Sequence, residues 1–460
     1  MTCRNIGWQA LAAAGIALAL TSCATPARPR NVLVITLDTM RADRLPAYGF
    51  SGVSTPALDE LAREGMLFEA AFAATPLTLP SHATLFTGLY PSKLGIRDNA
   101  GAPLRREFQT LAETMAAHGL RTGAFVASAV LAADRGLDQG FQTYSTAGTE
   151  SCRDARARRP ADAVVDDALA WLAKDEAPFF AWIHLYDTHR PYRLPDEYSR
   201  GYPDPYLAAI TFEDSQIARV VKHLRERRVL DDTLIVIAGD HGESLGDHGE
   251  DSHGIFIYQE TLHVPLIMRG PGVKPGRVDH VVRLVDVMPT ILEVAGWPVS
   301  PSDGVSLWRL MKGLPEEKAR EVYSESLYPE RFGWAPLRSV RADRYKVIDA
   351  PRPELYDLEL DPAEQSNLIS AKASIAAAML ARVRAHKDDH LPQVETPISD
   401  ERAAQLASLG YVAKAPAMLA VASPLGADPK DMINEFNRFT SLQAAHAGAP
   451  PRCLPTPPTR

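Results

Sequence analysis

The sequence predicts an α/β protein with one large, mostly parallel sheet covered by helices and a small antiparallel sheet that follows it. Two observations support this prediction. Between residues 31 and 295, β-branched apolar runs alternate with amphipathic stretches that carry helix start and stop signals. From residue 321 onward, short strand-like pieces are joined by turns. We therefore expect a main domain over residues 31–320 and a C-terminal subdomain over residues 321–395.

The strands of the main domain are expected where the apolar runs lie. Their ranges are Asn31–Leu37, Met66–Ala73, Thr122–Ser128, Phe179–Leu185, Thr233–Ile237 and Val264–Met268. Proline at the first helical position and glycine after the last, as in Pro56 and Gly65, mark helix boundaries. The other helices are expected from Pro80 to Gly88 and over Phe108–His118, Ala161–Ala173, Pro205–Arg227 and Val285–Ala295. This alternation favours parallel strands with helices on both faces.

The C-terminal part has a different pattern. Its short strands are expected at Glu321–Ser326, Leu337–Arg341, Tyr345–Ile348 and Leu355–Leu358, followed by a helix over Ala371–His386. The tail from residue 396 to residue 460 is rich in alanine and is expected to be partly helical, with disorder from Gly448 onward.

The amino terminus has the pattern of a signal peptide over residues 1–22. Arg4 precedes the apolar run Ala10–Leu20, and Leu20–Cys23 resembles a bacterial lipobox. We expect an exported lipoprotein, periplasmic or at the cell surface, anchored to a bacterial membrane through a lipidated Cys23 and a tether over residues 23–30. The alternative is an ordinary signal peptide in which Cys23 is incidental. Cys152 and Cys453 could pair, but they form neither a disulfide framework nor a zinc site.

The composition excludes some partners. The chain is 46% hydrophobic and 23% charged, which is ordinary for a globular protein, and its formal net charge is -8. A nucleic-acid-binding protein would carry a basic surface, so we expect no nucleic-acid partner. A local cluster of cations could still bind an anionic substrate.

Candidate metal ligands lie at strand ends. Asp240 and His241 follow the strand that begins at Thr233, between two glycines that let another group approach the backbone closely. Asp38 ends the first strand. Ligands of open α/β sheets bind at the carboxyl ends of the strands, and Asp with His suits a divalent cation.

A candidate nucleophile lies in the loop over residues 75–82. Thr78 precedes the expected helix at Pro80, where free backbone amides could hold the oxygens of an ester while its hydroxyl attacks. The alternative is that Thr78 only caps this helix. His189 and His253 also lie at element ends and could take part in proton transfer.

These motifs resemble the sulfatase family of the alkaline phosphatase superfamily. The matching stretches are Asn31–Gly49, Thr55–Gly95, Ala238–Arg269 and Glu354–Leu368. The resemblance implies an alkaline-phosphatase-like α/β sandwich in which residues 31–320 form the catalytic domain. By position it implies that Asp38, Asp240 and His241 bind the metal and that Thr78 is the nucleophile. It also implies that His189 is the substrate-facing histidine of the His-x-Pro segment, and His253 lies near the family's sulfate-binding lysine.

The chain departs from the family pattern at several positions. The family usually has a Cys or Ser that is oxidised to formylglycine where Thr78 stands, and threonine cannot undergo this change. His82 replaces an arginine, Thr39 replaces a second aspartate, and residues 125–136 contain no Lys-x-His segment. With a threonine at this position, the chain resembles the phosphoester enzymes of the superfamily, some of which use a threonine nucleophile.

We therefore expect a hydrolase that cleaves a small-molecule or glycan sulfate or phosphate ester through a covalent threonine intermediate. A single divalent cation, Mn, Mg, Ca or Zn, would be held by Asp38, Thr78, Asp240 and His241, and the Asp–His pair favours Mn or Zn over Ca. His189 or His253 would protonate the leaving oxygen. Two alternatives remain: a phospho- or phosphoglycerol-type transferase, and a lipoprotein that binds anionic glycans without turnover.

Overall fold

The main sheet has eight strands in the order β4-β3-β5-β1-β6-β7-β2-β8. The computed structural model describes residues 28–146, 158–316, 318–387, 398–412, 419 and 426–447. The strands are β1 (Asn31–Leu37), β2 (Met66–Phe72), β3 (Arg121–Val126), β4 (Thr143–Ser145), β5 (Phe179–Leu185), β6 (Thr233–Gly239), β7 (His263–Arg269) and β8 (Gly276–Arg283). Within this sheet, β7 alone runs antiparallel, to both β6 and β2. The predicted large, mostly parallel sheet is confirmed.

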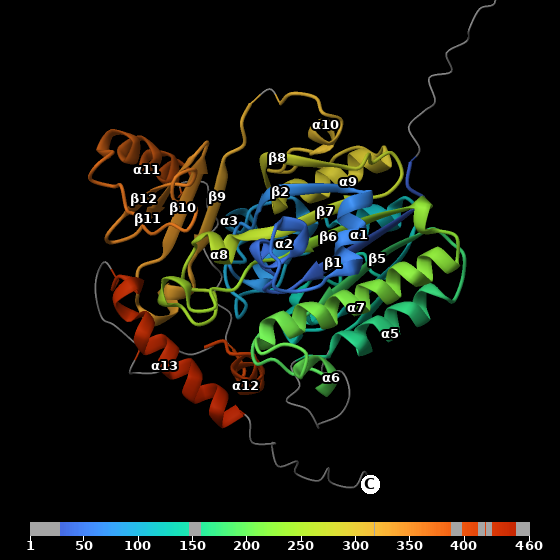
Figure 1. The fold of residues 1–460 in the computed structure, drawn as a ribbon, viewed down its shortest axis with the longest axis horizontal. Coiled ribbons are helices and arrows are strands. Elements are labelled where there is room, and N and C mark those ends of the chain that lie inside the picture. The colour runs from blue at the N-terminus through green and yellow to red at the C-terminus, as the bar shows by residue number, and fades with distance from the viewer. Residues whose placement is uncertain are drawn as a thin grey trace, which may run out of the picture.

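Helices cover the sheet in two groups. The longer ones are α1 (Pro56–Glu64), α2 (Thr78–Thr87), α4 (Leu111–Ala117), α5 (Ala161–Leu172), α7 (Pro205–Glu226) and α9 (Val287–Ala295). Helix α7 packs against α1 and α5, whereas α2 packs against α4 and α9 (Figure 1). Every residue of β1, β5 and β6 is buried, as expected for parallel strands that are covered on both faces.

The small sheet is antiparallel, in the order β12-β11-β10-β9. Its strands are β9 (Val322–Ser326), β10 (Leu337–Ala342), β11 (Tyr345–Asp349) and β12 (Glu354–Asp357), and α11 (Ala373–Lys387) packs against β10 and β11. Figure 1 shows this unit beside the main sheet. All four strands agree with the predicted ranges to within a residue or two.

Three features of the main domain differ from the sequence prediction. Strands β4 and β8 were not expected, since β4 has three residues and β8 alternates charged and apolar residues at the sheet edge. Helix α2 begins at Thr78, two residues before Pro80. The first four amides of a helix have no intrahelical partner, so a proline at the third position breaks no hydrogen bond.

The tail contains two helices, α12 (Asp400–Ser408) and α13 (Pro429–Ala447), which pack against each other. Several predictions fall outside the described residues. They are the signal peptide with Cys23, the possible pairing of Cys152 with Cys453, and the expected disorder from Gly448 onward. Among the helices in the described part of the chain, none is long and apolar enough to cross a membrane.

Candidate active site

Neighbouring strands bring the predicted ligands together. In the β1–β6 register Leu37 faces Gly239, and Asp38 and Asp240 follow these residues directly. The amide of Asp240 donates to the carbonyl of Leu37 at 3.3 Å. Asp38 and Asp240 therefore lie side by side at the carboxyl edge of the sheet, with His241 next to them.

The geometry of this cluster fits a divalent cation. One ligand atom from each of Asp38, Asp240 and His241 lies within 4.8 Å of the others. Asp38 Oδ1 and Asp240 Oδ2 are buried, and no described residue hydrogen-bonds to them. Nδ1 of His241 donates to the carbonyl of Gly242 at 2.9 Å, so Nε2 keeps its lone pair for a ligand. Two buried carboxylate oxygens without partners are costly unless a positive charge compensates them.

Burial shifts the pKa values of all three candidate ligands toward their neutral forms. Burial raises the pKa of Asp38 to about 7, although His253 and the hydrogen bond from Thr78 act in the opposite direction. Burial and then the negative charge of Asp38 raise the pKa of Asp240 well above its ordinary value. Burial holds the pKa of His241 well below its ordinary value, so its imidazole is neutral. A neutral imidazole is the form that binds a metal.

Thr78 points into this cluster and does not cap its helix. Leu77 is the N-cap residue of α2, and the fully buried Thr78 is the first helical residue. Its Oγ1 donates to Asp38 Oδ2 at 3.2 Å or faces His241 Nε2 at 3.3 Å. The hydroxyl is therefore held by two of the candidate metal ligands.

The backbone amides after Thr78 are not available to an ester, contrary to the sequence prediction. The amide of Leu79 donates to Asn99 Oδ1 at 2.8 Å, and that of Ser81 donates to the carbonyl of Leu77 at 3.1 Å. Pro80 has no N–H. These contacts fix the start of α2, so the oxygens of an ester would depend on side chains and a cation.

His82 supports Thr78 as a neutral group. Its Nδ1 donates to the carbonyl of Thr78 at 2.8 Å, and its Nε2 lies 3.0 Å from the hydroxyl of Thr36, which accepts a hydrogen bond from Trp182. Burial lowers the pKa of His82 well below its ordinary value. His82 also forms a second possible metal group with His184 and Asp240. Since both of its nitrogens are engaged, the first group is the better cation site.

His189 and His253 meet on the open side of the nucleophile. Nδ1 of His189 donates to the backbone carbonyl of Arg190, whereas Nδ1 of His253 lies 3.2 Å from a carboxylate oxygen of Glu243. Their Nε2 atoms lie 3.3 and 3.0 Å from the hydroxyl of Tyr411. The structure thus brings both predicted proton-transfer residues to one point.

Sequence reasoning missed His184 and Tyr411. His184 is the one titratable residue in the apolar strand β5, in register with Thr36, and its Nε2 lies 3.3 Å from Asp38 Oδ2. That single polar residue in a buried strand was the signal that could have identified it. Tyr411 lies 333 positions from Thr78 in the sequence, and its neighbours carry no comparable pattern.

The structure has one cavity beside the candidate site and a larger one away from it. A cavity of about 580 Å³ is lined by His189, His253 and Tyr411, together with Arg190 and Phe436. A larger cavity of about 920 Å³ lies between the two sheets, and none of the predicted site residues lines it.

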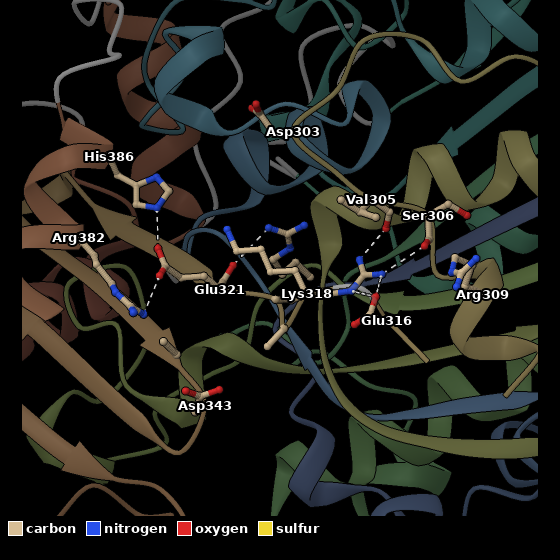
Figure 2. Close-up of a pocket in the computed structure, with 14 residues that line it drawn as sticks. Asp303, Val305, Ser306, Arg309, Glu316, Lys318, Glu321, Asp343, Arg382 and His386 are labelled. Carbon is tan, nitrogen blue, oxygen red and sulfur yellow. Dashed lines mark hydrogen bonds and ion pairs between the residues drawn. The ribbon is translucent and has the colours of Figure 1, made fainter. Parts of the chain in front are cut away.

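Some of the charged groups that line the larger cavity form ion pairs (Figure 2). Glu321 binds Arg382 at 3.2 Å and His386 at 3.0 Å, and Arg320 pairs with Glu316 and with Asp286. The smaller cavity, which His189 and His253 line, is therefore the one next to the candidate nucleophile.

Known proteins are similar to most of this chain. A family model described as Sulfatase matches residues 30–297, and one described as N-sulphoglucosamine sulphohydrolase, C-terminal, matches residues 246–389. Delta 4,5-hexuronate-2-O-sulfatase of Bacteroides thetaiotaomicron is 27% identical over 442 residues, which cover 81% of this chain and 91% of that protein. Choline-sulfatase of Rhizobium meliloti is 26% identical over 429 residues, covering 74% and 82%.

A solved structure supports the fold. Phosphonate monoester hydrolase of Agrobacterium radiobacter superposes with a TM-score of 0.68 at 22% identity, covering 81% of this chain and 99% of that one. The alkaline-phosphatase-like α/β architecture predicted from the motifs is thereby confirmed.

Proposed function

Because the chain belongs to the sulfatase family and is a sulfuric or phosphoric ester hydrolase, we propose that Thr78 is its nucleophile and that the reaction depends on a divalent cation. The observation that carries this proposal is the position of the Thr78 hydroxyl. It lies 3.2 Å from Asp38 and 3.3 Å from His241, beside two buried carboxylate oxygens without partners.

The residues that would hold the cation are Asp38, Asp240, His241 and the Thr78 oxygen. A divalent cation bound there would lower the pKa of a coordinating hydroxyl and offset the negative charge of the ester. Carboxylates with an imidazole suit Mn or Zn better than Ca, and Mg remains compatible with the carboxylates.

In the first step, the Thr78 oxygen attacks the sulfur or phosphorus and its proton passes to Asp38 Oδ2, 3.2 Å away. The bond to the leaving oxygen breaks in line. His253 donates the proton to that oxygen through its Nε2, while its Nδ1 is held by the Glu243 carboxylate at 3.2 Å. Nδ1 of His189 donates to a backbone carbonyl, and burial lowers the pKa of His189 well below its ordinary value, so its Nε2 accepts a hydrogen bond rather than donating a proton.

The second step returns the groups to their first state. Threonine has no second hydroxyl, so the sulfated or phosphorylated Thr78 cannot expel its group as a formylglycine hydrate can. Water must attack the sulfur or phosphorus directly. His253, now neutral, takes the proton from the water, and Asp38 returns its proton to the Thr78 oxygen.

Two observations favour different esters as the substrate. The relatives named above are sulfatases, which favours a sulfate ester of a sugar or small molecule. Threonine in place of a formylglycine precursor favours a phosphate ester. The same intermediate could pass its group to an alcohol, which is the transferase alternative.

Assays of the purified chain with aryl sulfate and aryl phosphate, with and without Mn²⁺, test the proposal. We expect cation-dependent hydrolysis of at least one ester, and Thr78→Ala should lower kcat by about 10³-fold or more. Thr78→Ser, which keeps the hydroxyl, is the matched control and should retain part of the rate. Equal rates for Thr78→Ala and the wild type would contradict the proposal. Product increased by an added alcohol acceptor would indicate transfer, and ester binding without turnover would indicate a binding protein.

We also propose that the chain is exported and anchored through Cys23, on the basis of the Leu20–Cys23 motif. In a bacterial host, labelled palmitate should be incorporated into the wild type and not into Cys23→Ala. Equal labelling, or release of both proteins in soluble form, would contradict the anchor.

A further inference from the structure

The candidate nucleophile is covered by a side chain from the tail. Thr78, Asp38, Asp240 and His241 are fully buried. The hydroxyl of Tyr411 lies 3.2 Å from Thr78 Oγ1, on the side that faces His189 and His253. The Tyr411 phenol thus occupies the space next to the reacting oxygen.

A defined turn directs Tyr411 into the site. We call residues 398–412, which contain α12, the strap. After α12 the backbone of Gly410 is left-handed, with φ of 88°, and the amide of Tyr411 donates back to the carbonyl of Leu406 at 2.9 Å. This is a Schellman helix ending, in which glycine tolerates the left-handed conformation. The turn points the next side chain away from the helix and toward Thr78.

Apolar packing and hydrogen bonds hold the strap in this position. Leu406 and Leu409 are buried against the core. Two polar contacts flank the turn: Arg402 donates to the carbonyl of Ala129 at 2.9 Å, and the amide of Val412 donates to the hydroxyl of Tyr328 at 2.6 Å. The strap therefore packs on the main domain and on α13 through apolar side chains, which also include Tyr411 and Val412, and through these hydrogen bonds.

The position of Tyr411 is incompatible with a bound ester. In-line transfer needs the sulfur or phosphorus about 3–3.5 Å from the Thr78 oxygen, with the leaving oxygen toward the proton donor. The Tyr411 oxygen already lies at that distance and contacts both histidines. The cavity of about 580 Å³ includes His189, His253 and Tyr411 in its wall but not Thr78. Tyr411 thus lies between the cavity and the nucleophile.

We propose that Tyr411 occupies the subsite of the transferred sulfuryl or phosphoryl group, and that the strap must withdraw it before an ester can reach Thr78. The cavity then receives the alcohol part of the ester. This inference rests on the proposed function. Arg190 and Arg193 line the cavity and supply positive charge for an approaching ester.

Binding of inorganic phosphate to the full chain, with Mn²⁺ added, tests the inference without requiring turnover. If Tyr411 competes for the subsite, Tyr411→Ala should bind phosphate about tenfold more tightly or better, because the closed state no longer reduces the competent fraction. Tyr411→Phe, which removes only the hydroxyl, should give a smaller gain and serves if the alanine variant does not fold. Tyr192→Ala widens the same cavity at a residue that does not cover Thr78, and should change affinity by no more than about twofold.

Hydrogen exchange provides the second measurement. Phosphate should increase amide exchange in residues 398–412 of the wild type, since the strap leaves the site when the anion binds. Unchanged or weaker phosphate binding in folded Tyr411→Phe and Tyr411→Ala would overturn the inference and make Tyr411 part of the binding site. If neither the wild type nor Tyr411→Ala hydrolyses an ester but Tyr411→Ala binds phosphate more tightly, the proposed function fails and the inference about Tyr411 stands. If the wild type hydrolyses an ester and the Tyr411 variants do not change the affinity for phosphate, the inference about Tyr411 is wrong and the proposed function stands.

Discussion

Histidines in the candidate active site and at the junction of the two sheets differ in the charge of their imidazole rings. In the site, His82, His189 and His241 each donate one N–H to a backbone carbonyl. Burial lowers the pKa of all three well below the ordinary value. Each ring is neutral and keeps one nitrogen as an acceptor.

His248 lies in the loop between β6 and β7 and has different partners. Its Nδ1 lies 2.6 Å from a carboxylate oxygen of Glu260, and its Nε2 lies 3.1 Å from the carbonyl of Glu364. Both of these partners can only accept, so they favour a ring that carries two protons. Burial lowers the pKa of His248, but the hydrogen bond and charge of Glu260 outweigh burial and the net shift is upward.

The comparison shows that the partner of one nitrogen sets the charge of the ring. A carbonyl leaves a neutral imidazole that can bind a cation, and a carboxylate produces an imidazolium that links two parts of the fold. None of these three neutral histidines therefore supplies a positive charge to the carboxylates of Asp38 and Asp240.

The largest effect is expected from Asp38→Asn. Activity should fall by about 10³-fold or more, and added Mn²⁺ should no longer raise Tm. Without the cation, however, the variant should be more stable than the wild type by about 1–3 kcal/mol at pH 8, because a neutral amide replaces a buried carboxylate with an unpartnered oxygen. Thermal and urea unfolding with and without Mn²⁺ measure both effects.

Asp303→Asn is the matched control, because Asp303 pairs with Lys93 and accepts from the amide of Tyr90. Its stability should fall by about 0.5–1 kcal/mol and its activity should be retained. A cation-free Asp38→Asn protein less stable than the wild type would show that Asp38 is compensated within the protein.

A smaller effect is expected when the two neutral histidines beside Thr78 are compared. His241→Gln removes a proposed cation ligand and should lower cation affinity and kcat/KM by at least about 100-fold. His82→Gln removes a group whose nitrogens already bind Thr78 and Thr36, so cation affinity should change by less than about fivefold. Isothermal titration with Mn²⁺ measures the difference. Equal losses in both variants would indicate that His82 also binds the cation.

The smallest effect on activity is expected at the junction. His248→Gln should lower stability by about 1–2 kcal/mol at pH 6 and leave kcat within about twofold. The folded pKa of His248 is raised above 6.5, so the stability that it contributes is fully present below the unfolded pKa and is lost as pH rises through the folded pKa. The difference between variant and wild type should therefore shrink from pH 6 to pH 9 in urea unfolding. A difference that grows with pH would contradict a protonated His248.

The parts of the site that the sequence predicts are those that follow from strand geometry. Apolar β-branched runs identified β1 and β6, and parallel pairing necessarily brings Asp38 and Asp240 to the same edge. The small sheet was likewise predicted from its short strands and turns. Edge strands such as β8 escaped prediction because their alternating charged residues resemble a loop.

Contacts made only through tertiary packing were not predictable. Tyr411 reaches Thr78 because α12 docks on the main domain, and no local pattern encodes a contact across 333 positions. The engagement of the Leu79 amide by Asn99 depends on a loop conformation that composition does not reveal. The motifs predicted Thr78 as the nucleophile, but not the side chain that covers it.

The most direct test of Thr78 as the nucleophile is to quench the full chain in acid during turnover of an aryl sulfate or aryl phosphate and to map the covalent product by peptide mass spectrometry. We predict one sulfuryl or phosphoryl group on the peptide that contains Thr78, formed in the presence of the cation and absent from Thr78→Ala. Turnover at the wild-type rate with no label on this peptide, or with the label on another residue, would contradict the mechanism.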